Sequence, residues 1–390
     1  MTSIYLEISE LQPLMQSWRH DLHQHPELGF EEFRTAKIIA TLLRGFGLEV
    51  HENIGKTGVV GVLTKGDNPD AIGLRADMDG LQIHEQNNFA HKSKHDGKMH
   101  ACGHDGHTAM LLGAAKALSE KPDFKGTAYF IFQPAEEHGR GALGMVEDGL
   151  FEKFPMDAIY AMHNMPSIPL GHFALCDGPI MACEDNFEII IKGKGTHAAL
   201  PHLGIDPIII GAEIVTALQT IISREFDPLE KGVVSVTDFN SNGTRNVIPG
   251  QVTLKGDTRS FRPEIQQKIE DAMHRIVKGI CLAHGADYDF SYSREFAATI
   301  NSTIESQIAA KIATKIVGTD KVNSNCQPVM ASEDFGFILQ HKKGCYLFLG
   351  NGGDGPGGCG LHSPDYDFND DILTLGASFW VELIKAQLPL

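Results

Sequence analysis

The first third of the chain alternates segments whose apolar residues follow helical spacing with segments typical of strands. Ile38, Ile39, Leu42 and Leu43 recur at helical spacing within 35–46, which predicts a helix. Short runs rich in β-branched and aliphatic residues predict strands. Strands separated by helices indicate an α/β layered sheet. The helices expected here are 11–19, 35–46 and 108–118, and the strands are 58–64, 71–75, 127–132 and 158–162.

This rhythm changes between residues 185 and 296. The order there becomes strand–helix–strand–strand–helix–strand, which is typical of a ferredoxin-like unit. After residue 297 the α/β alternation resumes. We therefore expect a discontinuous main domain, 1–184 and 297–390, interrupted by an inserted α+β domain, 185–296. The elements expected after residue 185 are strands 186–192, 233–239, 252–258, 287–292 and 345–349 and helices 207–226, 263–284 and 304–317.

Composition and charge narrow the classes of function. The 390 residues include 33 Lys+Arg and 50 Asp+Glu, a net charge of −17, which argues against binding a nucleic-acid backbone. No apolar run approaches the roughly 20 residues of a membrane-spanning helix, so no membrane partner is expected. The N-terminal residues lack the basic opening and long apolar stretch of a signal peptide. A cytoplasmic protein is expected, and seven scattered cysteines agree with reduced thiols.

The densest cluster of reactive side chains lies in 99–108, within a chain that contains 19 histidines. Cys102 and His104 are two residues apart, and in an extended loop this spacing points both side chains to one side. Thiolate sulfur and imidazole nitrogen are ligands for zinc-like ions. The alternative is a buried cysteine in a segment that caps a helix starting near Thr108.

Further candidates follow predicted strands. Glu136 and Glu137 come just after a buried strand, and consecutive side chains point different ways. One carboxylate could hold a metal while the other moves protons, although a solvated turn is the simpler alternative. Asp77 and His163 also follow strands, and open α/β sheets bind ligands at the carboxyl ends of their strands. His362 follows a glycine-rich loop.

These motifs together resemble the co-catalytic dinuclear metallohydrolases that include aminoacylase, carboxypeptidase G and acetylornithine deacetylase. Within that family the chain is most similar to the amidohydrolase branch of hippurate hydrolases, N-acyl-amino-acid hydrolases and plant indole-acetyl-amino-acid hydrolases. The resemblance spans nearly the whole chain. The segments that carry it are Arg19–Leu28, Leu74–Asp79, Met99–Thr108, Gln133–Glu137, Met162–His163, Gly193–Pro201, Arg245–Pro249, Ser332–Phe335 and Leu361–Pro364.

The resemblance implies a zinc-peptidase-like catalytic domain with a mixed sheet and two divalent metal ions per subunit. The ions could be zinc, manganese, cobalt or nickel, and a thiolate ligand favours zinc-like ions over magnesium or calcium. It further implies that Glu136 is the general acid–base and that Asp77 is an acid that orients the site. The implied metal ligands are Cys102, His104, Glu137, His163 and His362.

The resemblance also implies that the inserted domain is a lid through which two copies form a homodimer. By analogy, His197 reaches the reacting carbonyl, either in its own site or in that of the partner subunit. Asn246 would contact the substrate, and Arg259 is a further candidate for binding the substrate carboxylate.

The implied reaction is hydrolysis of a small N-acyl amino acid, either hippurate-like or N-acetylated, by a metal-activated water. A dipeptidase or another amide hydrolase of the same family is the alternative. Two further hypotheses stay open. Cys102 could be a nucleophile activated by His104, or the chain could be a non-catalytic metal-binding relative. The sequence specifies neither the acyl group nor the amino acid.

Overall fold

The structure is a computed structural model that describes residues 3–354 and 357–390. The chain folds into two units, each of which is described by itself. Unit 1 takes in the chain up to Ile180 together with Ile300–Pro328 and Asp334–Leu390. Unit 2 takes in Met181–Thr299 and Val329–Glu333. The short strands β7 (Gly178–Met181) and β14 (Thr299–Asn301) lie where the chain passes between the units.

An eight-stranded mixed sheet forms the centre of unit 1, in the order β1-β2-β4-β3-β5-β16-β6-β15. β3 is parallel to both β4 and β5, and β16 is parallel to β5. β3 and β16 are buried along their whole length, as expected for parallel strands covered on both faces. The strands are β1 (Glu49–Ile54), β2 (Gly58–Lys65), β3 (Ala71–Asp77), β4 (Gly126–Gln133), β5 (Ala158–Pro166), β6 (Phe173–Ala174), β15 (Val322–Asn323) and β16 (Gly344–Gly352).

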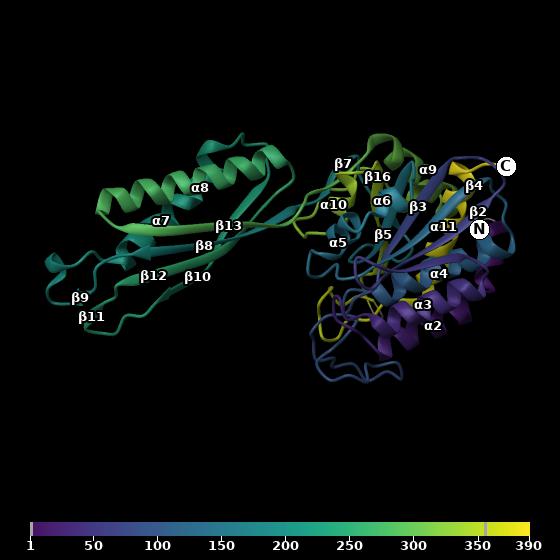
Figure 1. Cartoon of the computed structure of the whole chain (residues 1–390), viewed down its shortest axis with the longest axis horizontal. Helices are drawn as coiled ribbons and strands as arrows, with labels where there is room; N and C mark the ends of the chain where they lie inside the picture. The colour runs from purple at the N-terminus through teal and green to yellow at the C-terminus, as the bar shows by residue number, and fades with distance from the viewer. Residues whose placement is uncertain (1–2, 355–356) are drawn as a thin grey trace. The chain divides into compact units, whose positions relative to one another are not determined.

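Helices pack against this sheet through one large hydrophobic cluster. It joins Met15 of α2, Ile39 of α3, Leu111 of α4 and Leu383 of α11 to strand residues such as Phe130. Figure 1 shows α2, α3 and α4 lying together beside the sheet. The helices of unit 1 are α1 (Ser3–Ser9), α2 (Gln12–Gln24), α3 (Phe33–Gly45), α4 (His104–Glu120), α5 (Gly141–Glu147), α6 (Leu150–Lys153), α9 (Thr303–Val317), α10 (Phe335–Leu339) and α11 (Leu373–Gln387).

Unit 2 is built around a four-stranded antiparallel sheet in the order β10-β12-β8-β13. Two helices lie along one face of it (Figure 1), and Ile189, Ile214 and Val277 join helices and sheet in one core. Chain order and sheet order are those of a ferredoxin-like unit. The elements are β8 (Cys183–Lys192), α7 (Pro207–Thr220), β10 (Gly232–Ser241), β12 (Gln251–Ser260), α8 (Pro263–His284) and β13 (Asp287–Phe296).

The helical run that begins with α7 corrects one expectation from the sequence. Pro207–Glu225 is 19 residues long and contains an 18-residue window with a mean hydropathy of 1.3, so by length and composition alone it could cross a membrane. The expectation that no apolar run approaches this length was wrong. Polar residues such as Glu213 and Gln219 interrupt the apolar residues of this segment, so it does not stand out as one continuous run in the sequence. Ile210, Ile214 and Leu218 of this run are buried in the core of unit 2. A single helix of this kind is weak evidence for a membrane.

Buried ion pairs join α2 to the first turn of α4. His23 Nδ1 lies 2.8 Å from Asp105 Oδ2, and His23 Nε2 lies 3.2 Å from Glu85 Oε1. Arg19 Nε lies 3.3 Å from the same Asp105 oxygen. Burial lowers the pKa of His23, but Asp105 and Glu85 outweigh this effect and raise the pKa to about 9. The imidazolium of His23 is therefore part of the folded structure at neutral pH.

We expect His23→Gln to destabilise the protein in a pH-dependent way. The folded-state pKa is raised above the ordinary value of 6.5, so the stabilisation is complete below about pH 6.5 and is lost as the pH rises through 9. Breaking a buried ion pair costs about 3–5 kcal/mol of unfolding free energy. Urea denaturation of metal-free protein should show this loss at pH 6 and a smaller one at pH 9.5.

The exposed pair of His51 with Glu49, at 2.9 Å, provides the matched control, because surface ion pairs contribute little. His51→Gln should change stability only slightly at either pH. An equal loss of stability in His23→Gln at both pH values would contradict the charged state assigned to His23.

Candidate metal centre

The first group of candidate residues lies at the carboxyl ends of neighbouring parallel strands. Asp77 is the last residue of β3 and pairs in parallel register with Gln133, the last residue of β4. Glu136 and Glu137 follow β4 in a tight turn. His163 lies inside β5, not after its end, because β5 continues to pair with β16 as far as Pro166. The expected strand 158–162 was too short.

Cys102 and His104 come together by a different route from the one expected. Gly103 has a left-handed backbone (φ 92°) and turns the chain directly into α4, whose first residue is His104. The expectations of an extended loop here and of a helix starting at Thr108 were both wrong. A Cβ atom on Gly103 would lie 2.2 Å from Asn164 Oδ1, so only glycine fits this turn.

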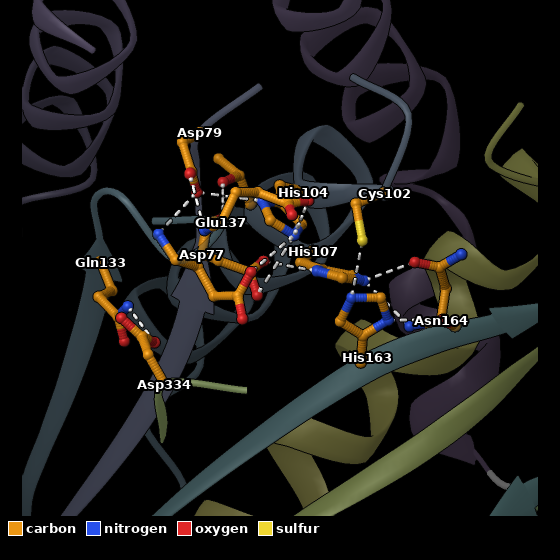
Figure 2. A network of polar contacts seen from close by, with 12 residues as sticks. Asp77, Asp79, Cys102, His104, His107, Gln133, Glu137, His163, Asn164 and Asp334 are labelled. Carbon is orange, nitrogen blue, oxygen red and sulfur yellow. Dashed lines mark hydrogen bonds and ion pairs between the residues drawn. The ribbon is translucent and has the colours of Figure 1, made fainter. Parts of the chain in front are cut away.

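The five residues expected to bind metal all belong to unit 1 and lie close to one another. Cys102, His104 and Glu137 offer ligand atoms that lie within 4.8 Å of one another. Cys102 Sγ is 3.4 Å from His163 Nε2, and His362 Nε2 is 3.3 Å from Glu137 Oε1. Figure 2 shows the first four of these side chains converging from separate segments.

The imidazole rings are oriented with one nitrogen toward the cluster. His163 Nδ1 lies 2.6 Å from the backbone oxygen of Asn164, and His104 Nδ1 lies 3.2 Å from Asp79 Oδ1. These contacts leave Nε2 of each ring pointing at the other candidate ligands. His104 Nε2 is buried and makes no hydrogen bond within the part of the chain that the structure describes. Metal-binding histidines are typically held in this way.

The electrostatics of the cluster fit bound cations. Burial lowers the pKa of His104, but Asp77 and Asp79 outweigh it and raise the pKa to about 10. Burial also lowers the pKa of His163, and the neighbouring His107 lowers it further, so His163 is a neutral donor. Excess buried negative charge is unfavourable unless a cation compensates it. The donor set of thiol, imidazole and carboxylate groups suits divalent transition ions.

Asp79 organises this centre, although sequence reasoning assigned it no role beyond its place after a predicted strand. It is almost fully buried at 1% exposure. Besides its contact with His104, its two oxygens accept hydrogen bonds from the backbone N–H groups of Glu136 and Glu137, each at 3.1 Å. Figure 2 shows these contacts around Asp79. One carboxylate thus links the end of β3, the start of α4 and the turn after β4.

A second buried network lies behind Asp77. Arg75 Nη1 donates to Asp77 Oδ2 at 2.8 Å, and His107 Nδ1 lies 2.6 Å from Asp77 Oδ1. His107 Nε2 lies 2.8 Å from Asn164 Oδ1. Burial alone would raise the pKa of Asp77, but the neighbouring histidines and Arg75 hold it well below its usual range. Asp77 is therefore an ionised carboxylate held in place on both sides, as its expected orienting role requires.

Sequence reasoning missed His107, Asn164 and Asp334, which complete this network. Asp334 Oδ1 accepts from Gln133 Nε2 at 2.7 Å and lies 3.2 Å from Arg75 Nη2. His107 carried a usable signal, since it lies three residues after His104 on one helix and so faces the same way. Asp77, His104, His107 and His163 also form a second group whose possible ligand atoms lie within 4.8 Å of one another.

The residues expected to contact the substrate belong to unit 2. His197 lies in the short strand β9 (Thr196–His197), which pairs with β11 (Val247–Ile248). The structure brings His197 and Asn246 together, because the backbone oxygen of Asn246 accepts from Ala198 N at 3.0 Å.

Arg259, the candidate for the substrate carboxylate, is already engaged within unit 2. It binds Glu184 at 2.8 Å, Asp257 at 2.7 Å and Ser332 Oγ at 2.9 Å. All three nitrogens of its guanidinium therefore have partners. These contacts favour a structural role in holding the segment that contains Ser332.

The hypothesis of a nucleophilic Cys102 does not fit this geometry. A catalytic thiol needs a lowered pKa, whereas burial raises the pKa of Cys102 well above its usual range and Glu137 raises it further. Its Sγ atom lies 3.4 Å from Nε2 of His163 and is not in a comparable contact with the expected activator His104. A bound metal ion would instead remove the proton from such a thiol.

Known proteins resemble this chain along almost its whole length. Residues 73–386 match the family model described as peptidase family M20/M25/M40. The hippurate hydrolase of Campylobacter jejuni is 43% identical over 382 residues, which cover 98% of each chain. The N-acetylcysteine deacetylase of Bacillus subtilis is 36% identical over 367 residues, 94% of each chain. The solved structure of Bacillus subtilis YXEP, titled a dinuclear metal binding peptidase, matches with a TM-score of 0.85 and 33% identity, covering 97% of this chain and 99% of that one.

We expect Cys102→Ser to lower the affinity for divalent metal. Mutating residues that hydrogen-bond to metal ligands typically weakens metal binding about 10–100-fold. Loss of a thiolate ligand itself should weaken metal binding at least as much. Calorimetric titration of chelator-treated protein with zinc measures the affinity, and elemental analysis gives the number of ions per chain. Cys359→Ser removes an exposed thiol and serves as the control. Unchanged affinity and stoichiometry in Cys102→Ser would rule out Cys102 as a ligand.

Proposed function

The chain belongs to peptidase family M20/M25/M40, and we propose that it hydrolyses the amide bond of N-acyl amino acids at the metal centre described above. The expected amidohydrolase branch and the expected mixed-sheet fold are confirmed by these matches. Relatives named for hydrolysis of hippurate and of N-acetylcysteine support a linear amide of an amino acid as the substrate class. The observation that carries the proposal is the convergence of Cys102, His104 and Glu137 beside Glu136.

Two divalent ions held by the five candidate ligands would polarise the scissile carbonyl and lower the pKa of a water molecule. The ligands in this proposal are Cys102, His104, Glu137, His163 and His362. Zinc-like ions suit the thiolate ligand best, and manganese, cobalt and nickel stay alternatives.

Glu136 moves the proton in this mechanism. Its carboxylate is buried, and Oε2 lies 4.0 Å from Nε2 of the ligand candidate His104. It accepts a proton from the attacking water and delivers that proton to the amide nitrogen as the C–N bond breaks. Glu137, the next residue, lies equally close to His104, at 3.9 Å, and in addition lies 3.3 Å from His362. The two neighbouring carboxylates can therefore act on different atoms.

We expect Glu136→Gln to lower kcat by about 10²–10⁴-fold, because the proton acceptor is lost while the metal ligands stay. Metal content should be unchanged. A panel of hippurate, N-acetyl amino acids, long-chain acyl amino acids and dipeptides, assayed with added zinc or manganese, measures the effect. Glu147→Gln, which changes an exposed acid at the end of α5, is the control.

Each outcome of this panel has a distinct meaning. Wild-type rates in Glu136→Gln would show that Glu136 is not the group that transfers the proton. Faster cleavage of dipeptides than of acyl amino acids by the wild-type protein would favour the dipeptidase alternative. Failure of the wild-type protein to hydrolyse any member of the panel would overturn the proposed function and favour a non-catalytic metal binder.

Unit 2 serves as a lid and dimerisation module in this proposal. His197 Nδ1 accepts a hydrogen bond from Ala199 N at 3.0 Å, so its proton lies on Nε2, where it can be donated to a developing oxyanion. Ile208 and Ile209 of α7 are exposed apolar residues that suit burial against a second copy. Asn246 stays a prediction for substrate contact. A cytoplasmic location stays a prediction, and the seven cysteines are free thiols.

A mixing experiment tests both the homodimer and the site in which His197 acts. His197→Ala and Glu136→Gln should each be nearly inactive, since loss of one oxyanion donor typically lowers kcat about 10²–10³-fold. If His197 acts in the partner's site, coexpression of the two variants in equal amounts should restore about a quarter of the wild-type sites, because half of the symmetric dimers are mixed and each has one complete site. No recovery would show that His197 acts in its own site or that no dimer forms, and light scattering separates these two outcomes.

A further inference from the structure

Three consecutive backbone N–H groups in the turn after β4 donate to buried carboxylate oxygens. Ala135 N donates to Glu32 Oε1 at 2.8 Å, and the next two N–H groups donate to the two oxygens of Asp79, each at 3.1 Å. The turn that presents Glu136 and Glu137 is therefore held by its main chain. Glu32 forms the first of these three contacts, and no role has been assigned to it so far.

The carboxylate of Glu32 is fixed by contacts on both of its oxygens. It is fully buried, and its second oxygen, Oε2, accepts from Thr57 Oγ1 at 2.6 Å. It stands at the start of α3 but does not cap that helix. Glu27 does so instead, accepting from Arg34 N at 3.0 Å and from Thr35 N at 2.8 Å. The carboxylate of Glu32 is directed away from its own helix and toward Ala135.

The backbone of Ala135 needs such a partner. Its φ of 49° lies in the left-handed region, which is unfavourable for a residue with a Cβ atom. Such conformations persist only where surrounding contacts hold them, and they concentrate at functional sites. The segment before Glu32 also packs closely here, since a Cβ atom on Gly29 would lie 3.0 Å from Ala135 Cα.

We propose that Glu32 is a positioning residue for catalysis: through its hydrogen bond to Ala135 N it holds the left-handed turn that aims the carboxylate of Glu136 at the reacting atoms. This inference rests on the proposed function. The carboxylate of Glu32 contacts Ala135 N and Thr57 Oγ1, neither of which belongs to a candidate ligand, so Glu32 acts on Glu136 through the backbone. A displacement of about 1 Å at a catalytic group can lower the rate about 10²-fold, so loss of this contact should affect turnover.

The chemistry of Glu32 suggests which substitutions should be tolerated. Burial raises the pKa of Glu32 to about 7. Burial therefore disfavours the ionised carboxylate, and a neutral side chain that keeps the acceptor oxygen should be tolerated. A glutamine keeps an acceptor oxygen for Ala135 N and an N–H₂ group that can donate to Thr57 Oγ1. Alanine removes the acceptor, and aspartate shortens the reach while keeping the carboxylate.

The experiment compares Glu32→Ala, Glu32→Asp and Glu32→Gln with the wild-type protein on the acyl amino acid that it cleaves fastest. We expect kcat to fall about 10²-fold in Glu32→Ala, to fall less in Glu32→Asp, and to be largely retained in Glu32→Gln. KM and metal content should stay near wild-type values in all three. Glu31→Gln is the matched control, because Glu31 is the exposed neighbour of Glu32.

Hydrogen exchange provides a readout that does not depend on activity or on metal. In chelator-treated wild-type protein, the amide of Ala135 should be protected, and peptides that cover 134–140 report on it. In Glu32→Ala these amides should exchange at least about 10-fold faster than in the wild-type protein. In Glu32→Gln the protection should be kept, because the glutamine still offers an acceptor oxygen for the hydrogen bond from Ala135 N.

The outcomes separate this inference from the proposed function. Wild-type kcat and wild-type protection in Glu32→Ala would overturn the positioning role while leaving the hydrolase intact. If Glu32→Ala fails to fold, Glu32→Asp answers the question, and wild-type kcat and protection there would overturn the role. An equal loss of kcat in Glu32→Gln and Glu32→Ala would also contradict it, because the acceptor oxygen would then not be what matters. A wild-type protein that cleaves no acyl amino acid would overturn the function, whereas the exchange result would still test the contact.

Discussion

Burial of carboxylates is the constraint on which the centre of unit 1 depends. A buried carboxylate costs free energy unless hydrogen-bond donors or a cation compensate its charge. Asp79 meets this requirement with two backbone N–H groups and the ring of His104. The same contacts that satisfy its charge bring β3, α4 and the turn after β4 to fixed positions. Glu137 lies against His104 and His362, so its charge is compensated within the group of candidate ligands that a divalent cation would complete.

The same rule extends the network away from the metal centre. One oxygen of Asp77 accepts a hydrogen bond from Arg75, and the other contacts Nδ1 of His107. His107 in turn contacts Asn164. Asn164 Nδ2 donates to the hydroxyl of Tyr366 at 2.5 Å. Each side chain from Asp77 to Tyr366 thus has a hydrogen-bond partner in this network. Buried polar networks make a structure rigid when all of their members have partners. The positions of the candidate ligands His104 and His163 thus depend on residues that are not themselves among the five candidate ligands.

The sequence predicted those features that depend on local pattern and on donor chemistry. Short apolar runs located the buried strands, and the thiol, imidazole and carboxylate side chains indicated candidate ligands, which the structure brings close together. It could not predict contacts made at long range. Asp334 meets Arg75 across 259 residues of chain. β5 continues past His163 because of its pairing with β16, which lies far along the chain. The left-handed turn at Gly103 was missed because the neighbour that leaves no room for a side chain there, Asn164, lies far along the chain.

Glu136 and Glu137 are chemically identical neighbours, so their proposed division into proton carrier and metal ligand has to come from their surroundings. In a regular strand the two would point to opposite faces of the sheet, and in a helix they would diverge by about 100°. The turn after β4 does neither, because Ala135 is left-handed and the next two N–H groups are held by Asp79. Both carboxylates therefore lie within 4.0 Å of His104 Nε2 while approaching it from different backbone positions. Main-chain hydrogen bonds to buried acids thus hold the turn from which Glu137 meets His362, while the role of Glu136 as proton carrier stays a proposal.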